Sequence, residues 1–141
     1  MHPKILWPNN KRFAFTIFDD TDRSNLKDSK LVYQYLSDLG FKTTRSVWVE
    51  ESSEPHKEQG VTCENSAYLE WLLEIKKEGF EIGYHNTTYS SSRRKEIKSG
   101  LEKFVKIFSQ NPKVMANHSG NQENIYWGPH RLSGTKRIIY N

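Results

Sequence analysis

The chain has 141 residues, of which 35% are hydrophobic and 27% are charged, and this composition predicts a single domain with a modest core. No stretch approaches the roughly 18 uninterrupted apolar residues of a membrane-spanning helix, and a lysine and two prolines interrupt the start where a secretory signal is apolar. We therefore expect a soluble, cytoplasmic protein. The net charge of +4 is scattered, which indicates neither nucleic-acid nor membrane binding. The single cysteine, Cys63, excludes an internal disulfide and a Cys-rich zinc site.

Short apolar runs alternate with apolar residues at helical spacing along the whole chain. The apolar runs predict strands at 12–18, 42–49, 80–84 and 113–117, with a fifth beginning at 138–140. The helical patterns between them end at Gly40, at Gly79 and at Asn111-Pro112. This alternation predicts an α/β domain with a parallel sheet of about four to five strands.

Residues that can bind a metal follow three of the predicted strands. Asp19 and Asp20 end the first strand, His85 follows the third and His118 follows the fourth. The carboxyl ends of parallel strands lie at the same edge of a sheet, so we expect these side chains to meet. Carboxylate and neutral imidazole are ligands of a catalytic Zn²⁺-like ion.

Each of these residues also has a structural interpretation. An Asp pair at a strand end often forms a turn or a helix cap, and an isolated histidine is more often structural than a ligand. Because three strand ends carry such groups, we favour metal binding or acid–base chemistry. His2, His56 and His130 fall in predicted loops or termini, and we expect them to be solvated.

Two segments resemble the polysaccharide deacetylase family, also called the NodB-homology family, whose fold is a distorted (β/α) barrel. FDD at 18–20 resembles its first motif, and YLEWLLEIKKEGFEIGYHN at 68–86 resembles the helix and strand before its second motif. The resemblance covers about residues 11–128. It implies that Asp19 is the catalytic base, and that Asp20 and His85 bind a divalent ion, Zn²⁺ first, with Co²⁺, Ni²⁺ or Mg²⁺ as alternatives. It also implies amide hydrolysis of an N-acetylated carbohydrate by a metal-activated water.

The sequence departs from the family pattern at several points. Tyr89 stands where the family has a second histidine, so our hypothesis is that His118 supplies the missing nitrogen, and Thr21 replaces the glycine after the aspartates. The family's later motifs have no match after residue 128. We therefore expect residues 1–141 to form one incomplete domain, a partial barrel of the deacetylase type whose open sheet edge invites self-association.

The substrate and its proton donor are indicated only by residue type. Trp48, Tyr126 and Trp127 are candidate stacking surfaces for a sugar, and His130 is a candidate proton donor for the leaving amine.

Two other functions compete with the deacetylase interpretation. Asp20-Thr21-Asp22 after an apolar strand resembles the opening motif of haloacid dehalogenase-like phosphatases, but the later acidic motif for Mg²⁺ is absent. The missing deacetylase motifs also fit a truncated or degenerate relative that acts as a binding or assembly module without catalysis.

Overall fold

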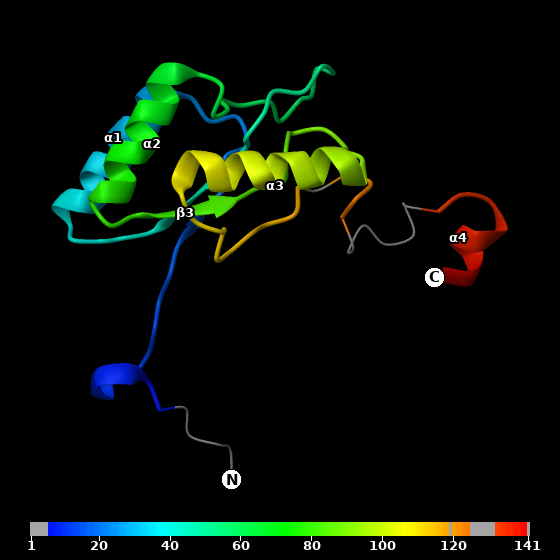
Figure 1. Cartoon of the computed structure of the whole chain (residues 1–141). Coiled ribbons are helices and arrows are strands. Elements are labelled where there is room, and N and C mark those ends of the chain that lie inside the picture. Colours follow the sequence, from blue (N-terminus) through cyan, green and yellow to red (C-terminus); the bar gives the residue numbers. More distant parts are fainter. Residues whose placement is uncertain (1–5, 119, 125–131, 141) are drawn as a thin grey trace, which may run out of the picture.

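The fold is built on a short parallel sheet whose strand order is β1–β2–β3. A computed structural model describes residues 6–118, 120–124 and 132–140 (Figure 1). The strands are β1 (Phe18–Asp19), β2 (Thr44–Val47) and β3 (Glu81–Tyr84). Phe18 is paired with Thr44, and Thr44 in turn with Glu81. The central strand is buried at every position although three of its four residues are polar.

Three helices alternate with the strands as the sequence predicts. They are α1 (Leu26–Asp38), α2 (Ser66–Lys77) and α3 (Arg94–Phe108). Asn25 and Asn65 cap the first two, because each side chain accepts a hydrogen bond from the backbone three residues later. The helices α1 and α2 pack side by side (Figure 1). The mixed α/β architecture with a parallel sheet is thus confirmed.

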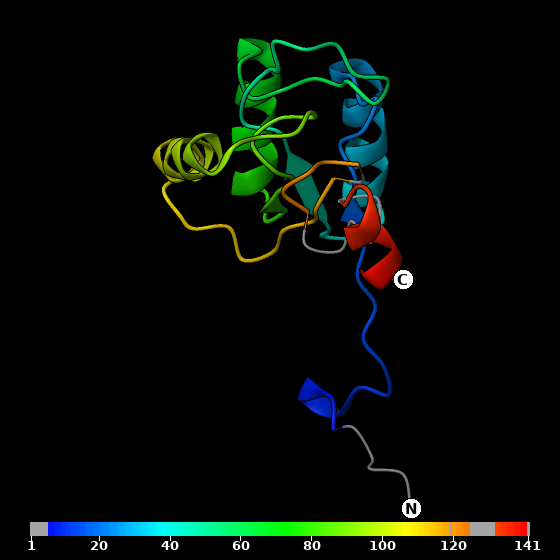
Figure 2. The same ribbon diagram turned by 90° about the vertical axis from the view of Figure 1, so that its right-hand side faces the viewer.

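The first predicted strand is much shorter than expected. Of residues 12–18 only Phe18 belongs to β1, and the preceding segment leads away from the sheet, through a 3-10 turn η1 (Pro8–Asn10), in Figures 1 and 2. Phe13 and Phe15 are 74% and 72% exposed. Residues 12–17 have the apolar composition of a strand, but pairing with β2 begins only at Phe18. A strand forms only where a neighbouring strand pairs with its backbone N–H and C=O groups.

The last two predicted strands are also absent as strands. Residues 113–117 contribute one parallel bridge, between Tyr84 and Met115. Residues 138–140 belong to a helix, α4 (Thr135–Tyr140), which lies apart from the sheet in Figure 1. A helix satisfies its own backbone hydrogen bonds, whereas a strand needs a neighbour. The expectation of four to five strands is therefore wrong for the described residues, which form an open three-stranded sheet.

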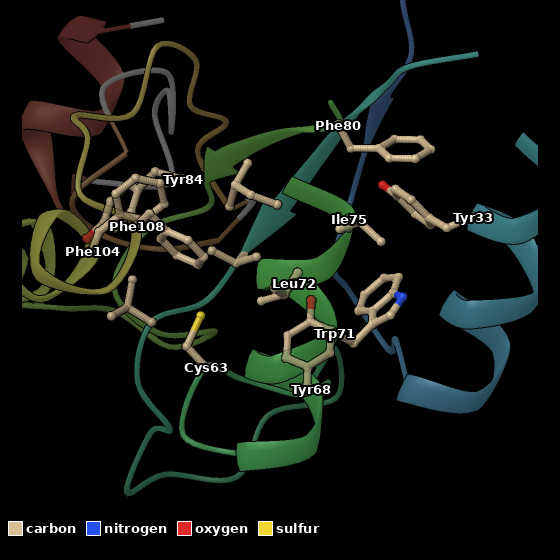
Figure 3. Close-up of a cluster of buried hydrophobic side chains, with 13 residues drawn as sticks. Tyr33, Cys63, Tyr68, Trp71, Leu72, Ile75, Phe80, Tyr84, Phe104 and Phe108 are labelled. Carbon is tan, nitrogen blue, oxygen red and sulfur yellow. The ribbon is translucent and has the colours of Figure 1, made fainter. Parts of the chain in front are cut away.

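The core lies where the three helices meet the sheet (Figure 3). Tyr33 of α1 packs edge-on against Trp71 of α2, with ring centroids 5.2 Å apart, and also contacts Phe80. Phe104 packs edge-on against Tyr84 and so joins α3 to β3. The same cluster extends through Tyr68, Leu72, Ile75, Ile82 and Phe108.

The apolar pattern that predicted α1 does not describe its buried face. Leu31, Val32, Tyr35 and Leu39 are all more than half exposed, while Tyr33 is buried. The self-association expected through the open sheet edge stays a prediction. Among the helices of the described residues, none has the length and apolarity to cross a membrane.

Candidate metal centre

Three chain segments meet at the carboxyl ends of the strands and bring together Asp22, His85 and His118. Asp22 lies in the turn after β1, His85 directly follows β3, and His118 follows the bridge at Met115. The Nε2 atom of His85 lies 3.4 Å from Asp22 Oδ1, and that of His118 lies 3.3 Å from Asp22 Oδ2. One ligand atom from each residue lies within 4.8 Å of the others. This is the expected meeting of strand ends.

The other ring nitrogen of each histidine faces an oxygen acceptor. His85 Nδ1 lies 3.1 Å from the carbonyl oxygen of Ala116, and His118 Nδ1 lies 3.4 Å from Asn121 Oδ1. The amide group of Asn121 donates to the carbonyl of Ser90, which fixes Oδ1 as the atom facing His118. In its neutral form each ring therefore carries its hydrogen on Nδ1 and presents the Nε2 lone pair to Asp22, as metal-binding histidines do.

The ligand atoms have no other hydrogen-bond partner among the described residues. Asp22 Oδ1, His85 Nε2 and His118 Nε2 are all buried and make no hydrogen bond to any described residue. Both histidine side chains are only 1–2% exposed. With both rings neutral, two lone pairs and a carboxylate face one another without a hydrogen between them, and such an arrangement is costly to bury. A divalent cation would satisfy all three, so the donor set fits a metal ion with one carboxylate and two imidazoles.

Asp20 lies at the exposed rim of this cluster. Its Oδ1 is 3.1 Å from His85 Nε2, and its side chain is 58% exposed. The same oxygen accepts a hydrogen bond from the backbone N–H of Asp22, which ties the two residues into one turn. Burial raises the pKa of Asp22 above its ordinary value and the Asp20 charge adds to this, whereas positive charge on His118 or His85 lowers it.

A buried aromatic layer supports the two histidines. The ring of Trp48, which is fully buried, stacks on His85 with centroids 5.5 Å apart and meets His118 edge-on at 5.7 Å. Tyr89 packs edge-on against Trp48, and its hydroxyl donates to the carbonyl of Ser52. Trp48 thus lies beneath the histidine rings, and Tyr89 supports Trp48 instead of reaching the cluster.

Asp19 is held on the α1 side of the sheet. Its Oδ2 lies 2.6 Å from Arg45 Nη1 and accepts a hydrogen bond from the hydroxyl of Tyr33 at 3.0 Å. The Arg45 side chain is 2% exposed and also donates from Nε to Tyr68. Adjacent residues of a strand point to opposite faces, which explains why Asp19 and Asp20 separate.

The sequence predicts that His85 and His118 lie together, as they do, but it does not place Asp22 with them. His118 does lie beside His85, as the hypothesis for the missing nitrogen required, and Asp20 lies next to them. Asp22 was not among the candidate metal-binding residues, although it is one of three aspartates within four positions of this turn. Tyr126, Trp127 and His130, the other proposed substrate residues, lie outside the described residues.

His56 is not solvated as expected. Its side chain is half-buried, and its ring meets that of His118 edge-on with centroids 5.2 Å apart. Nothing in the loop sequence indicated this, because the contact depends on how the loop folds over the strand ends.

Comparison of the chain with protein-family models, with curated proteins and with solved structures gave no match.

Proposed function

We propose that this chain is a metal-dependent hydrolase that cleaves the acetamide bond of an N-acetylated carbohydrate. The observation that carries the proposal is the facing arrangement of Asp22, His85 and His118, whose ligand atoms lie within 4.8 Å of one another. Zn²⁺ suits this donor set best, with Co²⁺, Ni²⁺ or Mg²⁺ as alternatives. The resemblance of FDD at 18–20 and of the segment 68–86 to the deacetylase motifs supports the reaction class and the substrate.

The finer fold assignment, a partial deacetylase-type barrel, belongs to this proposal. The parallel order β1–β2–β3 with a helix in each crossover supports it. So does the location of the candidate site at the carboxyl ends of the strands, where the sites of α/β barrels lie.

The carboxylates around the cluster have distinct roles in this proposal. When bound, a divalent ion would polarise the acetamide carbonyl and lower the pKa of water toward neutrality. Asp20 is the exposed carboxylate 3.1 Å from His85, and we assign to it the acceptance of the proton. Asp19, the base implied by the family resemblance, is engaged by Arg45 and Tyr33, so we assign it a structural role.

Hydrogen bonds from Nδ1 to a backbone oxygen and to an amide oxygen orient the two histidine rings. Ala116 fixes the tautomer of His85, and Asn121 fixes that of His118. Trp48 limits the rotation of both rings by packing against them. The site is therefore preorganised by this chain's own residues, which is what a catalytic metal site requires.

The test is metal content per folded chain after chelator treatment and reloading with Zn²⁺, Co²⁺ or Ni²⁺. We expect close to one equivalent for the unmodified chain and for Asp38→Asn, a control on the exposed end of α1. Asp22→Asn, which keeps the shape but removes the charge, should weaken metal binding by about tenfold or more. Acetate release from an N-acetylated oligosaccharide should fall sharply in Asp20→Asn at unchanged metal content.

Two results would contradict the proposal. A folded chain that binds no transition metal would favour the non-catalytic scaffold. A chain that binds one equivalent but releases no acetate from N-acetyl substrates, even at high protein concentration, would keep the metal site and refute the reaction.

A further inference from the structure

A short turn, residues 56–60, packs against the turn that carries Asp22. The backbone N–H of Arg23 donates to the carbonyl of Glu58, and the side chains of the same two residues form an ion pair at 2.6 Å. The N–H of Val61 donates to the carbonyl of Ser24. The 56–60 turn and the Asp22 turn are therefore held together as one unit.

Gly60 shows how close this packing is. A β-carbon at Gly60 would lie 2.7 Å from the carbonyl oxygen of Thr21 and 2.8 Å from the backbone nitrogen of Ser24. Real β-carbons essentially never approach backbone atoms so closely, so a glycine is needed at this contact. The position of His56 beside His118 is thus set by backbone contacts and not by its own side chain alone.

The hydrogen bond of the His56 ring determines its tautomer. Its Nδ1 lies 3.2 Å from the backbone nitrogen of Glu58, which can only donate. Nδ1 is therefore the acceptor, and the neutral ring carries its hydrogen on Nε2. This is the opposite tautomer from that of His85 and His118, whose Nδ1 atoms face oxygens.

The opposite tautomer gives His56 a different chemical capacity from the two cluster histidines. The ring of His56 lies edge-on to that of His118. Its nitrogen atoms nevertheless do not belong to the set of Asp22, His85 and His118 atoms that lie within 4.8 Å of one another. Within the described part of the chain, no hydrogen bond engages its Nε2–H. His56 thus offers a hydrogen-bond donor beside a site whose other members offer acceptors.

We propose that His56 donates a hydrogen bond from Nε2 to an oxygen of the carboxylate or amide ligand that binds at the Asp22–His85–His118 cluster. This inference rests on the proposed function, since it takes that cluster as the metal site. The ligand class follows from the chemistry, because a metal ion and an N–H donor together suit the oxygen of an acetamide or of the acetate product. His56 would orient that oxygen and stabilise negative charge on it.

The experiment measures the affinity of the Co²⁺-loaded chain for acetate through the visible absorption of the bound cobalt. His56→Phe keeps a ring beside His118 but removes the donor, while His56→Gln keeps an N–H near the position of Nε2. Lys57→Gln changes the neighbouring residue, which is 80% exposed, and serves as the matched control. Circular dichroism and metal content are recorded for each variant, so that folding and loading are known.

We expect His56→Phe to bind acetate about tenfold more weakly at unchanged cobalt content. His56→Gln should stay within about threefold of the unmodified chain, and Lys57→Gln should match it. Equal acetate affinity in His56→Phe and the unmodified chain would overturn the inference. A loss of cobalt in His56→Phe would also overturn it, because His56 would then be a ligand. If the unmodified chain binds no cobalt, the proposed function itself fails, and this inference with it.

Discussion

Arg45, which is buried, forms an ion pair with the partly exposed Asp19, in which Nη1 of the guanidinium lies 2.6 Å from Oδ2 of the carboxylate. The arginine is on the central strand and the aspartate on the edge strand, at paired positions in the register. The negative charge of Asp19 compensates the positive charge of Arg45, whose side chain is only 2% exposed. Asp19 therefore stabilises the fold independently of any role in catalysis.

Removing the charge of Asp19 should therefore destabilise the protein. We expect Asp19→Asn to lower the free energy of unfolding by about 3 kcal/mol, because it leaves the buried Arg45 charge without its partner. Asp38→Asn, at an exposed position, should change it by less than about 0.5 kcal/mol. Urea unfolding followed by tryptophan fluorescence measures both. Equal stability of the two variants would refute a structural role for Asp19.

Gly60→Ala should loosen the contact between the 56–60 turn and the Asp22 turn. The new β-carbon meets two backbone atoms that cannot move independently, so we expect a loss of about 1–3 kcal/mol in unfolding free energy. Gln59→Ala, at the exposed neighbouring position, is the control. Urea unfolding checks the stability, and weaker metal binding by Gly60→Ala alone would show that the turn supports the site.

Gly100→Ala in α3 should destabilise the chain although alanine favours helices. A β-carbon there would lie 2.5 Å from Oγ1 of Thr87, a fully buried residue that also hydrogen-bonds to Tyr84. Overpacking of this kind costs about 1–3 kcal/mol, more than the gain of about 1 kcal/mol in helix propensity. Ser99→Ala, exposed on the same helix, should be neutral or slightly stabilising in thermal unfolding. A more stable Gly100→Ala would contradict the packing described here.

Cys63 should make stability fall at high pH. Burial raises the pKa of its thiol from 9.0 to about 12. Below pH 9 both the folded and the unfolded chain keep the proton, so the group adds no pH dependence. Between about pH 9 and 12 only the unfolded chain loses it, and stability decreases as pH rises. Urea unfolding at pH 8 and pH 10 should show a larger loss for the unmodified chain than for Cys63→Ala, and equal losses would contradict the assignment.

The sequence was informative where local chemistry decides the structure. The alternation of strands and helices and the convergence of His85 and His118 follow from periodicity and strand direction. These signals depend on residues close in the chain or on the shared polarity of parallel strands.

The remaining features depend on partners that a single sequence does not specify. Residues 12–17 have the composition of a strand, but whether they form one depends on a neighbouring strand. Which of Asp19, Asp20 and Asp22 lies between the two histidines depends on how one turn bends after β1, and Arg45 binds Asp19 from another strand. The tautomer of His56 likewise depends on a backbone N–H within the folded loop.

Because β1 has only two residues, its pairing with β2 at the edge of the sheet is shorter than the pairing of β2 with β3. With only Phe18 and Asp19 in register with β2, few backbone hydrogen bonds hold the N-terminal segment to the rest of the chain. An ion shared by Asp22, His85 and His118 would act as a tether across that edge, much as a cross-link does, because its ligands come from distant segments. Hydrogen exchange at β1 would then slow on metal loading more than exchange in α2, so that local opening of the chain reports occupancy of the site.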